Sequence, residues 1–216
     1  MKTIEMPEYD NNFEIEKLQN EEMKEISNII EEILSYSEIK KIKLRSYYDS
    51  ALRFLMDDIR FCYRKFRLIA FNECEFYGCA DQISIMNLAM ISLMTDIEYK
   101  NPIDITIAKE DTHFKITYEV IVKNECITDY QIAKRKFADI YEKELYVACI
   151  CTQSENSYHI SIENGVLRAE AVIYPQIAID KELAFQAFGD NEKSLITKYL
   201  DILFKSIEGE GIEEEE

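Results

Sequence analysis

The chain is poor in the residues that interrupt regular structure, and it lacks long apolar runs. Five glycines and three prolines occur among its 216 residues, so we expect helices and strands joined by short connections. No stretch of about 18 or more uncharged apolar residues occurs, and no apolar run follows a basic N-terminal segment. We therefore expect no membrane span, no membrane partner and no signal peptide, and a cytoplasmic location.

Positive charge is also scarce. The chain has 25 lysines and arginines against 42 aspartates and glutamates, a formal net charge of −17. Such a charge disfavours binding to nucleic-acid phosphates or anionic lipids, so we expect no nucleic-acid partner. Acidic residues are concentrated in EGEGIEEEE, residues 208–216. With 47% hydrophobic residues, the chain can still bury a substantial core.

Metal-binding patterns are missing as well. The six cysteines form no CxxC pair, and the only two histidines, His113 and His159, lie far from most of them. A structural zinc site needs closely spaced cysteine or histidine ligands. We therefore expect reduced, buried thiols, and we predict no metal site and no other cofactor.

The most regular pattern that is present is SYHISIENGVLRAEAVIYP, residues 157–175. Apolar and polar residues alternate on both sides of Asn164-Gly165, a pair that tolerates the positive φ angles of a tight type I′ turn. Pro175 has no N–H to donate and would end the second strand. The pattern predicts a β-hairpin.

The N-terminal third has helical patterns. Apolar residues recur at three- and four-residue spacing from Glu14 to about Ser35, and again from about Ile42 to Phe71, where more than one side is apolar. A hairpin of two such helices cannot bury so wide a surface alone, so we expect it to dimerise into a four-helix bundle. The expected dimer interface consists of Ile26, Ile30, Ile33, Leu52, Leu55 and Ile59.

The remaining chain mixes helical and strand patterns. A nearly all-apolar helix from Gln82 to about Tyr99 precedes a hairpin that turns near residues 111–113, further helices, the hairpin of residues 157–175 and a last amphipathic helix. The predicted fold class is α+β. We divide the chain into a loose N-terminus (1–13), a helical hairpin (14–73), an α/β sandwich (74–176) and a C-terminal helix with an acidic tail (177–216).

This order resembles the core of a sensor histidine kinase, in which a dimerising hairpin precedes an ATP-binding domain of the GHKL type. The segments ISLMTDIEYKNPIDITI, FKITYEVIV and LYVACICTQSENSYHISIENGVLRAEAVIYP carry the resemblance. The chain more closely resembles the ChpT-type histidine phosphotransferases, through SIMNLAMISLMTDI and SALRFLMDDIRFCYRKFRLIAF. That resemblance implies a dimer in which a histidine on the first helix relays phosphate between receiver-domain aspartates.

The chain departs from these patterns where the chemistry would lie. Thr95, with Asp96 beside it, stands where the kinase pattern has a metal-binding asparagine. VIVKNECITD stands where a glycine-rich box is expected, and no glycine occurs between Cys79 and Asn164. Because glycine lets the backbone approach a nucleotide closely, we expect that no nucleotide site of this type exists.

The phosphoacceptor is missing too, since no histidine occurs before position 113. His113 and His159 are only weak candidates for an acceptor, which must be an exposed imidazole. One hypothesis is therefore a non-catalytic, dimeric docking protein that binds receiver domains or a kinase in two-component signalling. The other is an active phosphotransferase or other enzyme that uses an unrecognised acceptor. The candidate partner-binding residues on the first helix are Glu21, Glu22, Glu25 and Asn28.

The four-helix bundle predicts the mass in solution. Light scattering on a sizing column should give a species near twice 25.5 kDa, because two hairpins would bury their apolar faces against each other. Charged residues in place of Ile30 and Leu55 should disperse it. A clean monomer would contradict the bundle.

Overall fold

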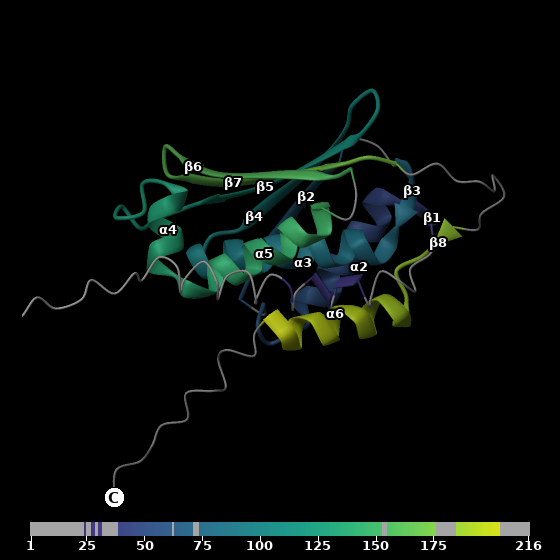
Figure 1. The fold of residues 1–216 in the computed structure, drawn as a ribbon, viewed down its shortest axis with the longest axis horizontal. Helices are drawn as coiled ribbons and strands as arrows, with labels where there is room; N and C mark the ends of the chain where they lie inside the picture. Colours follow the sequence, from purple (N-terminus) through teal and green to yellow (C-terminus); the bar gives the residue numbers. More distant parts are fainter. Residues whose placement is uncertain are drawn as a thin grey trace, which may run out of the picture.

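The computed structural model describes residues 24, 27–28, 30–31, 39–61, 63–70, 74–152, 155–175 and 185–203. These residues form a five-stranded sheet, a three-stranded sheet and a set of helices (Figure 1). No helix within them is long and apolar enough to cross a membrane. The mixed α and β architecture that we expected is confirmed for this part of the chain.

The five-stranded sheet forms one outer layer of the molecule. Its strand order is β2-β4-β5-β7-β6, with β2 parallel to β4 and the other neighbours antiparallel. Buried and less buried residues alternate along β4 and β5, because one face packs on helices and the other faces solvent. The bounds are Phe66–Ala70 for β2, Ile103–Lys109 for β4, Phe114–Ile121 for β5, Ser157–Glu163 for β6 and Val166–Ile173 for β7.

Both predicted hairpins are confirmed. β6 pairs antiparallel with β7, and the turn between them has positive φ at Asn164 (52°) and Gly165 (73°), as a type I′ turn requires. β4 pairs antiparallel with β5 around residues 110–113. The local sequence therefore determines these two connections and their register.

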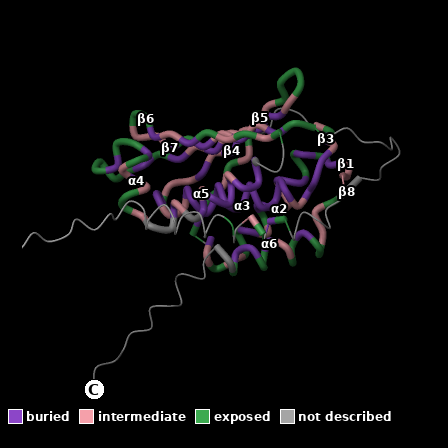
Figure 2. Tube along the Cα trace, in the orientation of Figure 1, coloured by how far each residue is buried: buried purple, intermediate pink, exposed green. Residues whose placement is uncertain are grey.

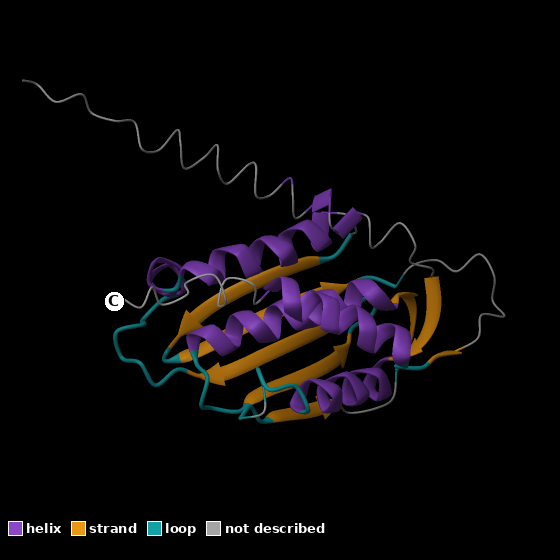
Figure 3. Cartoon of the chain, turned by 90° about the horizontal axis from the view of Figure 1, so that it is seen from below, coloured by secondary structure: helices purple, strands orange, loops and turns teal. Residues whose placement is uncertain are grey.

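The main helices lie on one side of the large sheet, as the view from below in Figure 3 shows. α3 and α5 pack together beneath it, and α6 packs against α3 on the side away from the sheet. The helices are α2 (Leu44–Met56), α3 (Ala80–Ile97), α4 (Tyr130–Lys136), α5 (Ala138–Thr152) and α6 (Asp190–Leu203).

The small sheet, in the order β3-β1-β8, lies at one end of the molecule (Figure 1). β1 (Ile39–Lys43) pairs antiparallel with β3 (Glu75–Cys79) and parallel with β8 (Phe185–Gln186). Because β8 precedes α6 closely in the chain, this pairing also holds the start of α6 near the rest of the fold.

α3 is buried around almost its whole circumference. Only Asp81, Thr95 and Asp96 among its residues are not buried, and Figure 2 shows the helices between the sheet and α6 as largely buried. The helix has no broad polar face because the sheet covers one side and α6 covers another. The residues of α6 that are buried in the core are Ile196, Tyr199 and Leu200.

Buried tyrosines connect α2, α3 and β5. The Tyr118 hydroxyl donates to Asn87 Oδ1 at 2.9 Å and lies 3.2 Å from the Tyr48 hydroxyl. The Tyr47 hydroxyl lies 2.6 Å from Ser84 Oγ. Burial raises the pKa of Tyr48 and Tyr118 above the ordinary value. These hydroxyls are therefore neutral and hydrogen-bonded, which offsets the cost of burying them.

The predicted second helix, from Ile42 to Phe71, is wrong in its extent. α2 ends at Met56, and residues 66–70 form β2, which pairs with β4. The helical spacing of apolar residues runs on past the end of α2, but Ile59, which fits that spacing, is not buried: it is 84% exposed. Pairing with β4 satisfies backbone groups along that strand and outweighs the local helical pattern. β2 is thus part of the large sheet, although it lies in the segment that we assigned to the helical hairpin.

The six residues that we expected at a dimer interface do not share one surface of the described chain. Most of the predicted first helix, with Ile26 and Ile33, falls outside the described residues. Ile30, Leu52 and Leu55 are buried within the single chain, whereas Ile59 is exposed. The hairpin and the dimer stay predictions. A charge at Leu55 would disturb the chain's own core, so Ile59 is the better position at which to test dimerisation.

The contact between α6 and α3 predicts a stability difference between two positions of α6. Leu200→Ala should lower the free energy of unfolding by about 2–5 kcal/mol, because it removes buried methyl groups and leaves a cavity. Lys198→Ala, at an exposed position of the same helix, should change it by less than about 0.5 kcal/mol. Urea unfolding of the full chain measures both, and equal effects would contradict the packing of α6 on α3.

Candidate functional site

The C-terminal end of α3 is the candidate site, because two of the helix's three residues that are not buried, Thr95 and Asp96, lie there. It is also where the resemblance to kinases leads us to look for a nucleotide. Asn101-Pro102 follows the helix, which ends at Ile97 as expected. Polar contacts join this end to residues 57–65, to the loop after β5 and to α5.

Arg64 connects the turn after α2 to the end of α3. It is 3% exposed. Its guanidinium donates to the carbonyl oxygens of Met94 (3.1 Å), Asn101 (2.5 Å) and Glu98, and to Thr95 Oγ1 (3.1 Å). Burial lowers the pKa of Arg64 to about 10, although nearby carboxylates raise it, so the side chain is a cation at neutral pH. A cation here satisfies carbonyls at a helix C-terminus, where positive charge is favourable.

Glu98 connects the loop after α3 to the loop after β5. Its carboxylate accepts hydrogen bonds from the backbone N–H groups of Lys100 and Lys123, each at 3.0 Å. Burial would raise the pKa of Glu98, but hydrogen bonds from these amides and that of Asn101, with the charge of Arg64, lower it below the ordinary value. The loop that stands in place of a glycine-rich box is therefore attached to α3 by an ionised side chain.

Asp96 and Lys143 form an ion pair between α3 and α5. Lys143 donates to Asp96 Oδ2, and the two side chains are 3% and 19% exposed, respectively. Next to Lys143, Glu144 accepts from the Tyr130 hydroxyl at 3.1 Å and pairs with Lys134 at 2.6 Å. Burial and the charge of Glu144 raise the pKa of Tyr130. Polar side chains of α3, α4 and α5 are thus engaged with one another.

The geometry at Thr95 fits a structural role. Thr95 Oγ1 donates to the carbonyl oxygen of Ile91 at 2.8 Å and accepts from Arg64 Nε at 3.1 Å. In the described part of the chain, no group of three histidine, cysteine, aspartate or glutamate residues could hold a metal ion. The charged groups at this end bind to other parts of the chain, and no glycine lies between residues 79 and 164 to admit a phosphate chain.

The two histidines lie elsewhere. His113 is in the β4–β5 turn, as predicted, with Nε2 2.8 Å from Glu110 Oε2 and Nδ1 3.4 Å from Thr112 Oγ1. Its ring centroid is 5.3 Å from that of Tyr174. His159 is exposed on β6, between residues that face the helices. The fold therefore does not bring either histidine to the end of α3.

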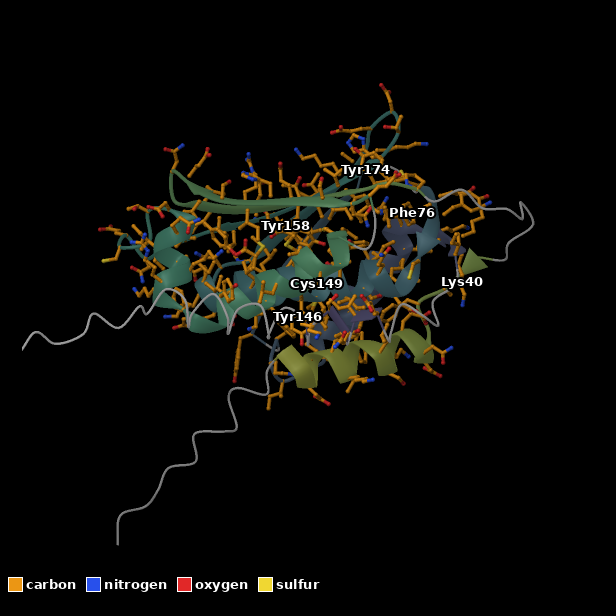
Figure 4. The ribbon with its side chains drawn as sticks, in the orientation of Figure 1. Lys40, Phe76, Tyr146, Cys149, Tyr158 and Tyr174 are labelled. Atoms are coloured by element: carbon orange, nitrogen blue, oxygen red, sulfur yellow. The ribbon has the colours of Figure 1, made fainter. Side chains whose placement is uncertain are left out.

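Two cysteines of α5 are buried, as expected for structural thiols. Figure 4 shows Cys149, with Tyr146 of the same helix, beneath the sheet that carries Tyr158. Burial raises the pKa of Cys149 and raises that of Cys151 to about 11. A thiol acts as a nucleophile in its ionised form, so neither cysteine is an activated nucleophile at neutral pH.

The partner-binding candidates of the first helix are largely beyond the described residues. Asn28 is exposed, while Glu21, Glu22 and Glu25 lie outside the described part of the chain. Arg64 and Lys143 were not predicted. Arg64 stands in a run of basic and apolar residues and Lys143 stands between two glutamates, and both patterns are typical of solvated helix faces. No local signal separates a buried cation from an exposed one before distant segments meet.

The opposite face of the large sheet is open and polar. The ion pairs Arg67–Asp104 and Arg168–Glu119 (2.6 Å) lie on it. A groove of about 270 Å³ runs between them and is bordered by Ile121, which is 63% exposed. This groove begins beside the loops at the end of α3, since the Asn101 side chain donates to the Ile121 carbonyl at 2.6 Å.

Comparison with known proteins identifies the fold of the chain, through its similarity to solved structures. No protein-family model and no curated protein matches the chain. Among solved structures, the catalytic domain of histidine kinase ThkA matches with a TM-score of 0.50 at 12% identity, over 64% of this chain and 96% of that one. The chain has a histidine-kinase-like fold.

Two other kinases agree. The Acinetobacter baumannii histidine kinase AdeS matches with a TM-score of 0.54 at 10% identity, over 80% of this chain and 88% of that one. A histidine kinase from Burkholderia phymatum STM815 matches with a TM-score of 0.53 at 7% identity, over 76% and 79%. At such low identities the likeness concerns the fold alone. The histidine-kinase-like α/β sandwich that we expected is therefore confirmed.

The contacts of Glu98 predict a specific pH dependence of stability. Because folding lowers the pKa of Glu98 from the ordinary 4.5, its ionised form stabilises the fold above that pH, and the contribution is lost as the pH falls through the lower value. Glu98→Gln should therefore destabilise the chain at neutral pH, with a difference from the native chain that shrinks as the pH falls below 4.5.

Glu125→Gln, in the same loop after β5 but exposed, is the matched control and should follow the native chain throughout. Urea unfolding at several pH values measures all three proteins. A constant difference between Glu98→Gln and the native chain would contradict the ionised, hydrogen-bonded state of Glu98.

Proposed function

We propose that this chain is a non-catalytic, histidine-phosphotransferase-like protein of two-component or phosphorelay signalling, which docks receiver domains or a kinase without passing phosphate. The observation that supports the proposal is the set of contacts at the C-terminal end of α3. There the charged side chains bind to one another and to the surrounding backbone through hydrogen bonds and an ion pair. These residues are Arg64, Asp96, Glu98 and Lys143.

Nucleotide binding at this position would separate these contacts. Breaking the ion pair between the partly exposed Asp96 and the buried Lys143 would cost stability, because the buried cation would lose this contact. Opening the loop after β5 would remove the hydrogen bonds that Glu98 accepts from Lys100 and Lys123. A nucleotide would have to repay both costs without a glycine-rich loop to donate backbone N–H groups.

A docking role is consistent with what the fold retains. The histidine-kinase-like sandwich supplies a rigid body, and the resemblance to ChpT-type phosphotransferases suggests a homodimer that meets receiver domains through its first helix. On this proposal, Glu21, Glu22, Glu25 and Asn28 contact the partner. Charged and polar contacts at the edge of a protein–protein interface determine specificity and the rate of association more than they determine affinity.

The alternative is an active phosphotransferase with an unusual acceptor. Its candidates are His113 and His159. Both ring nitrogens of His113 already have partners within its own turn, which disfavours in-line attack by that residue. His159 is exposed and therefore open to modification, so the experiment must include both.

The first experiment separates these functions. We expect no saturable binding of Mg-ATP to the full chain in calorimetry at concentrations at which a histidine kinase catalytic domain, run in parallel, is saturated. We expect measurable binding to a purified receiver domain or kinase cytoplasmic segment from the same genome, assayed as a panel. We also expect no acid-labile phosphate on the chain after incubation with a phosphorylated partner.

Charge-reversal variants test the docking face. Glu21→Lys with Glu25→Lys should weaken partner binding at least tenfold. Glu163→Lys, an exposed reversal on β6, is the matched control and should bind as the native chain does. Saturable ATP binding, or acid-labile phosphate on His113 or His159, would overturn the non-catalytic proposal; the absence of any partner in the complete panel would overturn docking.

A further inference from the structure

The loops at the end of α3 expose an unusual set of apolar side chains. The four most exposed large hydrophobic residues in the described chain are Tyr63 (90%), Ile59 (84%), Ile121 (63%) and Tyr99 (61%). They come from the turn after α2, the loop after α3 and the end of β5. Exposed apolar groups that cluster in this way mark interaction surfaces more often than isolated ones do.

Hydrogen bonds show that these loops are neighbours. The Ile103 amide donates to the Lys65 carbonyl at 2.9 Å, which places the start of β4 beside the turn after α2. The Asn101 side chain donates to the Ile121 carbonyl at 2.6 Å. Glu98 then joins the loop after α3 to Lys123. The exposed residues of the three loops therefore belong to one surface.

This surface is also basic, in a chain whose net charge is −17. Lys65, Lys100 and Lys123 are exposed there, and none of them forms an ion pair with a carboxylate of the described residues. Lys100 instead lies over the Tyr99 ring, 5.0 Å from its centroid. We call this set the loop surface: Tyr63, Lys65, Tyr99, Lys100, Ile121 and Lys123.

We propose that the acidic segment of this same chain that follows α6, residues 204–216, docks on the loop surface. The charges are complementary: six glutamates between positions 208 and 216 would meet three lysines. The apolar groups are complementary too, since Phe204 and Ile207 precede those glutamates, Ile212 stands among them, and the loop surface offers two tyrosines and an isoleucine.

The end of α6 lies close to the turn after α2, which carries part of the loop surface. Near the end of the helix, Asp201 Oδ1 lies 3.1 Å from Arg60 Nη1, and Arg60 stands three residues before Tyr63 and five before Lys65. An extended chain spans about 3.3–3.6 Å per residue. The loop surface therefore begins within about five residues of where α6 ends, and residues 208–216 can reach it.

The docked segment neutralises part of the basic surface and covers its exposed rings. The interaction depends on salt, because exposed charges attract each other over a Debye length that shrinks as the ionic strength rises. The docked segment also excludes other acidic chains from the loop surface. This inference does not depend on the docking function proposed above, which concerns the first helix.

Zero-length carbodiimide cross-linking of the full chain tests the proposal, because it joins a carboxylate and an amine only when they are in contact. Mass spectrometry should find links from residues 208–216 to Lys65, Lys100 or Lys123. Their yield should fall at least fivefold at about 0.5 M salt, where screening is strong. Lys109, exposed at the end of β4 and away from these loops, is the matched internal control and should be linked at least fivefold less.

Two variants make the test specific. Lys65→Glu with Lys123→Glu should remove the links to Lys100 as well, by weakening docking of the whole segment, whereas Lys109→Glu should leave them unchanged. Mixing isotope-labelled and unlabelled chains distinguishes contacts within one chain from contacts between copies. Links that are mainly between copies, or equal yields at Lys109 and the loop surface, would overturn the proposal.

A second measurement does not disturb the folded body. Replacing the six glutamates at positions 208, 210 and 213–216 by glutamine should shift the backbone amide NMR signals of Tyr99, Ile121 and Lys123 at low salt. The amide of Lys109 should not move. Unchanged signals at the loop surface would show that the segment does not dock there, whatever the cross-linking yields.

Discussion

The structure depends on covering α3 from both sides. This helix is apolar around its circumference. If it contacted the sheet alone, the apolar side chains on its other side would be exposed to water, at a cost of about 25 cal/mol for each Å² of apolar surface. α5 and the sheet cover one part, and α6 covers another through Ile196, Tyr199 and Leu200. The last described helix is therefore part of the core, although it comes after the sandwich in the chain.

The polar end of the same helix follows a different constraint. Carbonyl groups at a buried helix C-terminus need donors, and Arg64 supplies several at once. Its charge favours an ionised Glu98 nearby, and Glu98 in turn fixes the loop after β5. A loop that closes over a nucleotide must be able to open and close. Here the loop after β5 is held by a hydrogen bond from the Lys123 amide to the buried carboxylate of Glu98, which opposes such an opening.

The sequence predicted those elements whose signal is local. The β6–β7 hairpin follows from alternation around Asn164-Gly165, and α3 follows from its long apolar run before Asn101-Pro102. β2 was missed because Phe66, Leu68 and Ile69 extend the spacing of α2 while their strand pairs with β4, more than thirty residues later. At the site, Thr95 and Asp96 could be nominated from the sequence, but Arg64 and Lys143 could not, since burial arises only from contacts between distant segments.

The sequence by itself determined what chemistry is missing: no glycine stands between residues 79 and 164, and no histidine precedes position 113. A residue type that is absent stays absent in any fold. Only the tertiary structure decided that residues 66–70 are a strand, that α6 covers α3, and that Arg64 is an internal cation while Lys65 beside it is exposed. The physical reason is that strand pairing and burial depend on segments far apart in the chain, whereas periodicity reports only on neighbours.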